Sequence, residues 1–297
     1  MTSQTAGDAQ PPVPDSTVRS FAATLLPDQR QALTLLRAQA REVLPAHCIA
    51  FCCGSELLGH LLPSHALELA AVLPNATLHD GALVWQAPHS GSVERSVQLQ
   101  AALCELRDRG RMGGWRNEDF CFYLDRETRP DPMHSAFLQI ERAAFRYLGM
   151  MSHAVHINGF TPEGRMWCGQ RSSSKATDPG LWDNMTAGGL SAGESLESCA
   201  VRELWEEAGL RDLDPSTLRY AGHVRISRLT PTGWHDETLH IYNLQLPDDF
   251  VPSNQDGEVQ AFACLSAAQV LAGIADGQWT SDAALAIAQG VLYSSDL

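Results

Sequence analysis

The chain lacks the sequence features of several protein classes. It has no CxxC pair: of its eight cysteines only Cys52 and Cys53 are neighbours, and the others are scattered through apolar segments. Zinc sites and disulfide frameworks normally show closer spacing, so we expect free thiols. No run of about 18 apolar residues occurs, and the first 20 residues lack the apolar stretch of a signal peptide. These absences predict a cytoplasmic protein without a membrane partner.

Positive charge is also scarce. The chain has 21 Lys and Arg against 35 Asp and Glu, which gives a formal net charge of -14. Nucleic acids and anionic membranes need a basic face, so neither is expected as the main partner. A small anionic substrate is still compatible with this charge if it arrives with Mg²⁺ or Mn²⁺, or meets a few local Arg and Lys side chains.

The order of segments predicts an α+β fold with two domains. We predict a flexible tail over residues 1–20, an N-terminal α+β domain over residues 21–147, and a second domain over residues 148–297. Apolar residues at helical spacing predict amphipathic helices over residues 28–44 and 92–110. After residue 152 the sequence pattern changes to short β-rich segments separated by turns, and two predicted helices follow near the end of the chain.

One segment of the second domain, GGLSAGESLESCAVRELWEEAGL from Gly188 to Leu210, carries an unusual group of acids. Glu203, Glu206 and Glu207 share one face of a predicted helix, where their negative charges repel one another. Cations between them would relieve that repulsion, and hard oxygen ligands select Mg²⁺ or Mn²⁺. The opposite face is apolar and suits packing on a sheet.

The spacing of this segment argues against an ordinary solvated acidic helix. Arg202 lies four residues before Glu206 and can fix its carboxylate, while Gly209 suits a left-handed helix end. Seven Gly, Glu and Arg residues stand at defined intervals in this stretch, namely Gly188, Glu194, Arg202, Glu203, Glu206, Glu207 and Gly209.

This arrangement resembles the Nudix box, complete at each defining position. The resemblance implies an α/β/α sandwich and attack of water on a diphosphate linked to another group, which releases a monophosphate. It further implies the residue roles. Glu206 and Glu207 should bind metal, Glu203 should bind metal or act as the base, Glu194 and Arg202 should support catalysis, and Gly188 should offer a backbone carbonyl.

Other candidate site residues lie outside the box. The resemblance implies an additional metal-binding carboxylate from a loop outside the box, and Glu258, at a turn just before a predicted strand, is our candidate for it. Arg171 and Lys175 follow a predicted strand and are candidates for binding phosphate, and Trp182 is a candidate for binding the substrate's organic part.

The segments around the box resemble the thiamine-pyrophosphokinase-related Nudix group, which has an additional N-terminal domain. The matching N-terminal segments are Gly113–Asp125 and the helical IERAAFRYLG. This resemblance implies thiamine diphosphate, or its oxidised and damaged analogues, as the substrate. Thiamine is an aromatic cation, so its site should offer aromatic faces. We expect His156 and Asn158 to hydrogen-bond its pyrimidine.

Three alternatives stay open. The substrate could be another diphosphate, such as a nucleotide sugar, a dinucleotide or an oxidised nucleotide. Isopentenyl-diphosphate isomerase resembles Nudix proteins, but it needs a cysteine and a separate glutamate. A non-catalytic ligand-binding regulator would normally lack the box acids. We expect the enzyme to bind a small-molecule diphosphate and no nucleic acid. A homodimer is one assembly that we consider.

Overall fold

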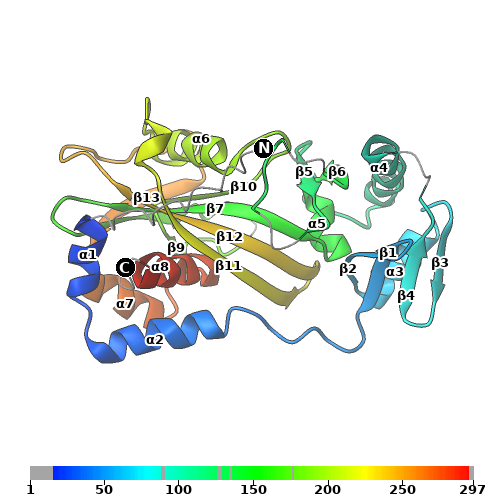
Figure 1. Ribbon diagram of the computed structural model, residues 1–297, viewed down its shortest axis with the longest axis horizontal. Helices are drawn as coiled ribbons and strands as arrows, with labels where there is room; N and C mark the ends of the chain where they lie inside the picture. The colour runs from blue at the N-terminus through cyan, green and yellow to red at the C-terminus, as the bar shows by residue number, and fades with distance from the viewer. Residues whose placement is uncertain (1–15, 88–90, 126–128, 134–135, 176, 294–297) are drawn as a thin grey trace, which may run out of the picture.

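The computed structural model describes residues 16–87, 91–125, 129–133, 136–175 and 177–293 of the 297-residue chain. It contains two bodies side by side along the long axis, each with its own β-sheet (Figure 1). The mixture of helices and sheets confirms the predicted α+β class.

The larger body is built on a seven-stranded mixed sheet. Its main path runs in the order β11-β12-β7-β8-β13, while β10 pairs with β7 and β9 pairs with β8. Strands β7 and β12 are parallel at the centre, and their neighbours are antiparallel. The strand bounds are β7 Met151–Phe160, β8 Met166–Arg171, β9 Trp182–Asp183, β10 Thr186–Gly189, β11 Arg219–Thr230, β12 Gly233–Gln245 and β13 Val259–Leu265.

Helices cover both faces of this sheet, as expected for a sandwich (Figure 1). Helix α6 (Leu196–Ala208) packs on one face through an apolar cluster with Val155 and Ile157. Helix α8 (Ser281–Tyr293) packs on the other face against Leu239 and Ile241. Successive strand residues point to opposite faces, so one strand supplies both cores. Helix α7 (Ala267–Ala275) lies on the α8 side, and the short 3₁₀ helix η1 (Pro215–Thr217) precedes β11.

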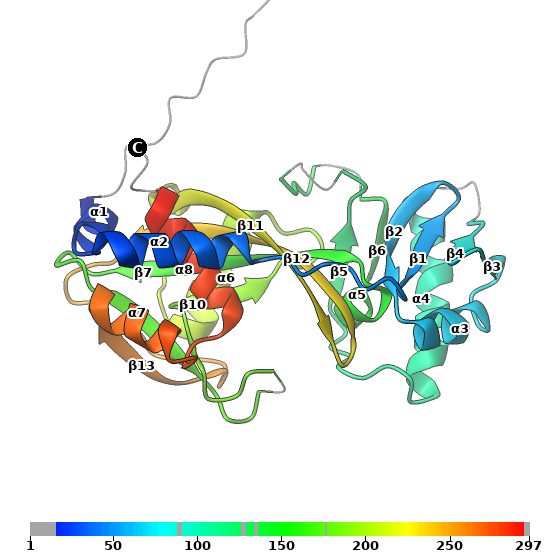
Figure 2. The same cartoon turned by 90° about the horizontal axis from the view of Figure 1, so that it is seen from below.

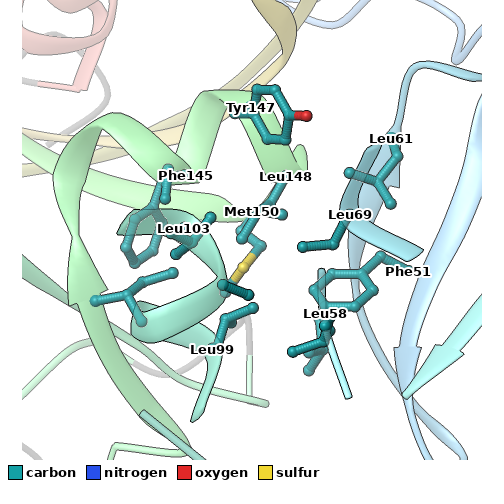
Figure 3. Close-up of a cluster of buried hydrophobic side chains, with 14 of the residues drawn as sticks. Phe51, Leu58, Leu61, Leu69, Leu99, Leu103, Phe145, Tyr147, Leu148 and Met150 are labelled. Carbon is teal, nitrogen blue, oxygen red and sulfur yellow. The ribbon is translucent and has the colours of Figure 1, made fainter. Parts of the chain in front are cut away.

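The smaller body has a separate core, which Figure 3 shows in part. Leucines and aromatic residues of its sheet and helices pack together there, including Phe51, Leu99 and Phe145. Its sheet has the order β2-β1-β4-β3, and β5 pairs with β6. The elements are β1 Ile49–Cys53, β2 Glu56–Leu61, α3 Pro63–Ala70, β3 Ala76–His79, β4 Ala82–Trp85, α4 Ser92–Asp108, β5 Asp119–Phe122, β6 Leu138–Glu141 and α5 Arg142–Leu148.

The N-terminal helices differ from the predicted domain division. Residues 1–15 of the expected tail lie outside the described residues, but Ser16–Ala23 form helix α1, and Pro27–Ala38 form helix α2. Both pack on the larger body (Figure 2), where Phe21 contacts Phe160 edge to face. The prediction that residues 16–20 are a tail and that residue 21 opens the N-terminal domain is therefore wrong. Burial of apolar side chains against distant strands orders this segment.

The helix α1 contact should be required for stability. Phe21 is 1% exposed, and a buried Phe→Ala change typically costs about 3 to 5 kcal/mol. We therefore expect Phe21→Ala to lower the free energy of unfolding by about that amount in denaturant titrations. Leu26→Ala, at a side chain that is 58% exposed, is the control and should change it by less than about 1 kcal/mol. Equal effects of the two changes would show that α1 does not pack as described.

Candidate functional site

Local sequence fixes both ends of the acidic helix α6. The Ser195 hydroxyl accepts a hydrogen bond from the Ser198 backbone N–H at 3.1 Å, which caps the first turn. Gly209 ends the helix with a φ of 70°, the left-handed conformation that favours glycine. The apolar stripe predicted for the helix is confirmed, because Ala200, Leu204 and Ala208 are buried. The helix therefore presents its acids from a rigid support.

Two box acids lie against strand β10. The Glu203 carboxylate sits directly over Gly188, in the space that a Cβ atom at position 188 would occupy. Glu207 accepts a hydrogen bond from the Ala187 backbone N–H at 2.9 Å. Both side chains are buried, each at 7% exposure. Strand β10 thus sets the positions of the two carboxylates.

Arg202 holds the remaining box acids. Its guanidinium donates to both oxygens of Glu194, at 2.7 and 3.0 Å, and to Glu203 at 2.5 Å and Glu206 at 3.0 Å. It also donates to the Gly189 carbonyl at 3.2 Å. One cation therefore screens the repulsion among three carboxylates and fixes their orientation. The predicted tether between Arg202 and Glu206 is confirmed.

A loop before β13 brings two more acids to the same place. One carboxylate oxygen each of Glu207, Asp256 and Glu258 lie within 4.8 Å of one another. Lys175, the only lysine of the chain, forms an ion pair with Glu258. The sequence predicted the positions of Glu258 and Lys175 near the box but missed Asp256, whose only signal was its place in the same turn.

Burial of these acids changes their protonation. Burial raises the pKa of Glu203 to about 7, although Arg202 acts in the opposite direction. Burial also raises the pKa of Glu207, with a further contribution from the charge of Glu203. Arg202 and Lys175 therefore offset only part of the cost of burying these two carboxylates.

The donor set suits a hard divalent cation. It consists of carboxylate oxygens from two separate segments, with the Gly188 backbone beside Glu203, and oxygen-only sets of this kind bind Mg²⁺ or Mn²⁺. Glu206 lies on the Arg202 side of the cluster and is more exposed than Glu203.

The smaller body contacts the box loop directly. Ser191 donates to Glu118 at 2.6 Å, the Ala192 N–H donates to the Asp119 carbonyl at 2.8 Å, and the Phe120 ring lies against Gly189. Beside these contacts is an open groove of about 490 Å³. Its lining combines an indole ring, two acids and several amides with part of the box loop. The lining residues are Gln100, Cys104, Arg107, Trp115, Asn117, Asp119, Gln139, Glu141, Ser191 and Ala192.

Two of the predicted substrate-binding residues support loops. The Arg171 guanidinium donates to the carbonyls of Thr177 and Asp178 and pairs with Asp183 at 3.3 Å. Arg171 therefore braces the loop that carries Lys175. Trp182 is half-buried and packs with the core beneath α8, where its backbone pairs with the segment at Trp279.

His156 and Asn158 correct the sequence prediction. Both are on the sheet face that α8 covers. Asn158 is fully buried and donates to Asn243 at 3.1 Å and to the Ala286 carbonyl at 3.3 Å, while His156 contacts Asn184 at 3.0 Å. Asn158 is therefore a structural residue that joins the sheet to α8, and His156 is 5% exposed and engaged with Asn184. The alternation of strand residues places these side chains away from the box helix.

A histidine pair on the α6 side of the sheet is a feature that sequence reasoning missed. His153 and His240 come from paired strands β7 and β12 and share a hydrogen bond of 3.1 Å. Burial lowers the pKa of His153 to about 4 and that of His240 to about 2. Both rings are therefore neutral in the folded protein at neutral pH.

The lowered pKa of His153 predicts that this histidine destabilises the fold in acid. Between the unfolded pKa of His153, near 6.5, and its folded value of about 4, the unfolded chain binds more protons than the folded one. The contribution of His153 to stability should therefore fall by up to about 3 kcal/mol as the pH falls from about 6.5 to 4, while the raised pKa of Glu203 contributes in the opposite direction. Denaturant unfolding at pH 7 and pH 5 measures this loss, which should shrink in His153→Gln. The exposed His47→Gln is the control; an unchanged loss in His153→Gln would contradict the assignment.

Known proteins match a large part of the chain. A family model described as NUDIX domain matches residues 152–285. The chain is 36% identical over 180 residues to Nudix hydrolase 24, chloroplastic, of Arabidopsis thaliana, which covers 60% of this chain and 48% of that protein. It is 38% identical over 168 residues to Nudix hydrolase 20, chloroplastic, of the same plant, which covers 56% and 43%.

A third relative is isopentenyl-diphosphate Delta-isomerase of Cutibacterium acnes, with 31% identity over 115 residues, 37% of this chain and 55% of that protein. The chain spans about half the length of the curated relatives it matches. The residues that the family model matches begin in β7 and end in α8. They include the whole acidic helix α6 and strand β10, which carries Gly188. The similarity to the NUDIX domain therefore covers residues 152–285 of this chain.

Proposed function

We propose that the chain is a divalent-metal-dependent pyrophosphohydrolase. In the proposed reaction, water attacks one phosphorus of a diphosphate, the bridging P–O bond breaks, and a monophosphate leaves. The observation that carries this proposal is the position of Glu203 and Glu207 against β10, beside Asp256 and Glu258. The similarity to the NUDIX domain and the Nudix hydrolase relatives support the same reaction class.

The metal-holding residues in this proposal are Glu203, Glu206, Glu207 and Glu258, with Asp256 added by the structure and the Gly188 carbonyl as a further oxygen. A divalent cation bound there would withdraw negative charge from the phosphoryl oxygens and activate water. Arg202 keeps the acids in place, with Glu194 as its main partner. Lys175 is available to bind a phosphate oxygen once it leaves Glu258.

The proposed substrate is thiamine diphosphate or one of its oxidised or damaged analogues. The resemblance of the segments around the box supports this choice, and so does the groove between the two bodies. The Trp115 indole and Asp119 line this groove together, and they would suit a cationic aromatic ring if it replaced the Arg107 guanidinium, which lies 4.5 Å from the centre of the Trp115 ring. The contact of the groove with Ser191 and Ala192 connects it to the box loop.

Location and assembly belong to the proposal as well. Of the helices within the described residues, none combines the length and the apolar composition of a membrane span. A cytoplasmic location and a homodimeric assembly stay predictions.

Glu207→Gln tests the reaction class. The change keeps the side-chain size but removes a buried carboxylate from the proposed metal set, so Mg²⁺-dependent hydrolysis should fall at least about 100-fold. The exposed Glu163→Gln, outside the domain's acidic helix, is the matched control and should keep full activity. Equal activity of the two variants would overturn the proposed site.

A substrate panel tests the finer proposal. The protein with Mg²⁺ is incubated with thiamine diphosphate, its oxo and oxy analogues, a nucleotide sugar, a dinucleotide, an oxidised nucleotide and isopentenyl diphosphate, and products are identified by mass. We expect monophosphates from the thiamine compounds, with one ¹⁸O incorporated from labelled water. Rapid cleavage of a nucleotide with no turnover of any thiamine compound would overturn the substrate while leaving the reaction class intact.

A further inference from the structure

A second group of metal-binding side chains lies on the opposite face of the large sheet from the box helix. His235 and Glu237 are neighbours on one face of β12, and Asp282 is in the first turn of α8. One ligand atom of each lies within 4.8 Å of the other two. The box acids are on the α6 side, so this cluster is separated from them by the sheet.

His235 provides the observation that points to a ligand. Its side chain is 5% exposed, and its Nε2 atom has no hydrogen-bond partner. A buried polar atom without a partner costs free energy, so it calls for an explanation such as a bound ion. Burial lowers the pKa of His235, which favours the neutral imidazole that binds metals.

The distance between His235 and Glu237 also fits a shared ion. Nε2 of His235 lies 3.6 Å from Oε2 of Glu237, which is too long for a hydrogen bond. Two ligand atoms that each lie about 2.1 Å from one ion are about 3.0 to 3.5 Å apart. A small inward movement would therefore let both bind one cation.

Hydrogen bonds from other side chains orient the two carboxylates, as is usual for carboxylates that bind metal. Ser152 donates to Oε1 of Glu237 at 2.7 Å, which leaves Oε2 toward His235. Arg228 donates to both oxygens of Asp282, at 2.7 and 3.0 Å. Each carboxylate oxygen has two lone pairs, so Asp282 can keep Arg228 and still bind a cation. Glu237 and Asp282 are partly exposed, which gives an ion a path from solvent.

We propose that His235, Glu237 and Asp282 form a second metal site that takes a divalent transition-metal ion such as Zn²⁺ or Co²⁺. The imidazole nitrogen distinguishes this set from the oxygen-only acids of the box, because nitrogen ligands favour transition metals over Mg²⁺. The ion would join β12 to the first turn of α8. Its main effect is therefore on the stability of the α8 face.

Co²⁺ titration in excess Mg²⁺ tests this site, since four- or five-coordinate Co²⁺ absorbs visible light much more strongly than six-coordinate Co²⁺, and Mg²⁺ competes for oxygen-only sites. We expect one Co²⁺ site per chain that Zn²⁺ displaces. His235→Ala should weaken it at least about tenfold, and Glu237→Gln, which is nearly isosteric, should do the same if His235→Ala fails to fold. Zn²⁺ should also raise the unfolding temperature of the wild type more than that of these variants.

Two controls separate this site from other metal ligands. His47→Ala removes an exposed histidine and should leave the Co²⁺ spectrum unchanged. Glu207→Gln alters the box and should also leave it unchanged, even where hydrolysis is lost. Absence of Co²⁺ bands in the wild type, an unaltered affinity in both His235→Ala and Glu237→Gln, or loss of the bands in Glu207→Gln would overturn the proposal.

Discussion

The candidate site depends on the close approach of helix α6 to strand β10. The Glu203 carboxylate occupies the space above Gly188, and Glu207 takes the Ala187 N–H as its hydrogen-bond donor. A side chain at position 188 would displace Glu203, so glycine is a steric requirement here. Helix α6 is held at this distance from the sheet by its apolar stripe, and its two ends are fixed by the caps at Ser195 and Gly209.

Electrostatics then determines what the site can bind. Three acids on one helix face would repel one another, and Arg202 compensates only part of that charge because it contacts Glu194, Glu203 and Glu206 but not the cluster of Glu207 and Glu258. Lys175 supplies a single positive charge to the latter cluster. An ammonium group paired with one of these carboxylates is consistent with the proposed binding of a metal ion and a phosphate there.

The sequence was informative where the signal is local. The spacing of the box predicted the helix, its left-handed end and the Arg202 tether, because these depend on residues within one or two turns. It also offered Glu258 and Lys175 as site residues from their places beside predicted strands, and the resemblance to a family supplied the expectation of an additional loop carboxylate. The sequence did not assign Trp115 to a site, and the structure places it in the groove beside the box loop.

The sequence was wrong where the outcome depends on distant contacts. Helix α1 is ordered by apolar packing against strands more than a hundred residues away, which no local pattern reveals. Asn158 has a side-chain type that suits ligand binding, but the register of β7 turns it toward α8. A shift of one residue along a strand changes the face, so only the observed pairing could decide this.

The most direct test of the account is Mn²⁺ binding by Gly188→Ala, measured by electron paramagnetic resonance together with hydrolysis rates. The added methyl group should displace Glu203, so we expect Mn²⁺ affinity to fall at least about tenfold and hydrolysis to fall with it. Gly113→Ala, where a Cβ atom meets nothing within 4 Å, is the control and should change neither. Wild-type Mn²⁺ affinity and hydrolysis in Gly188→Ala would contradict the account.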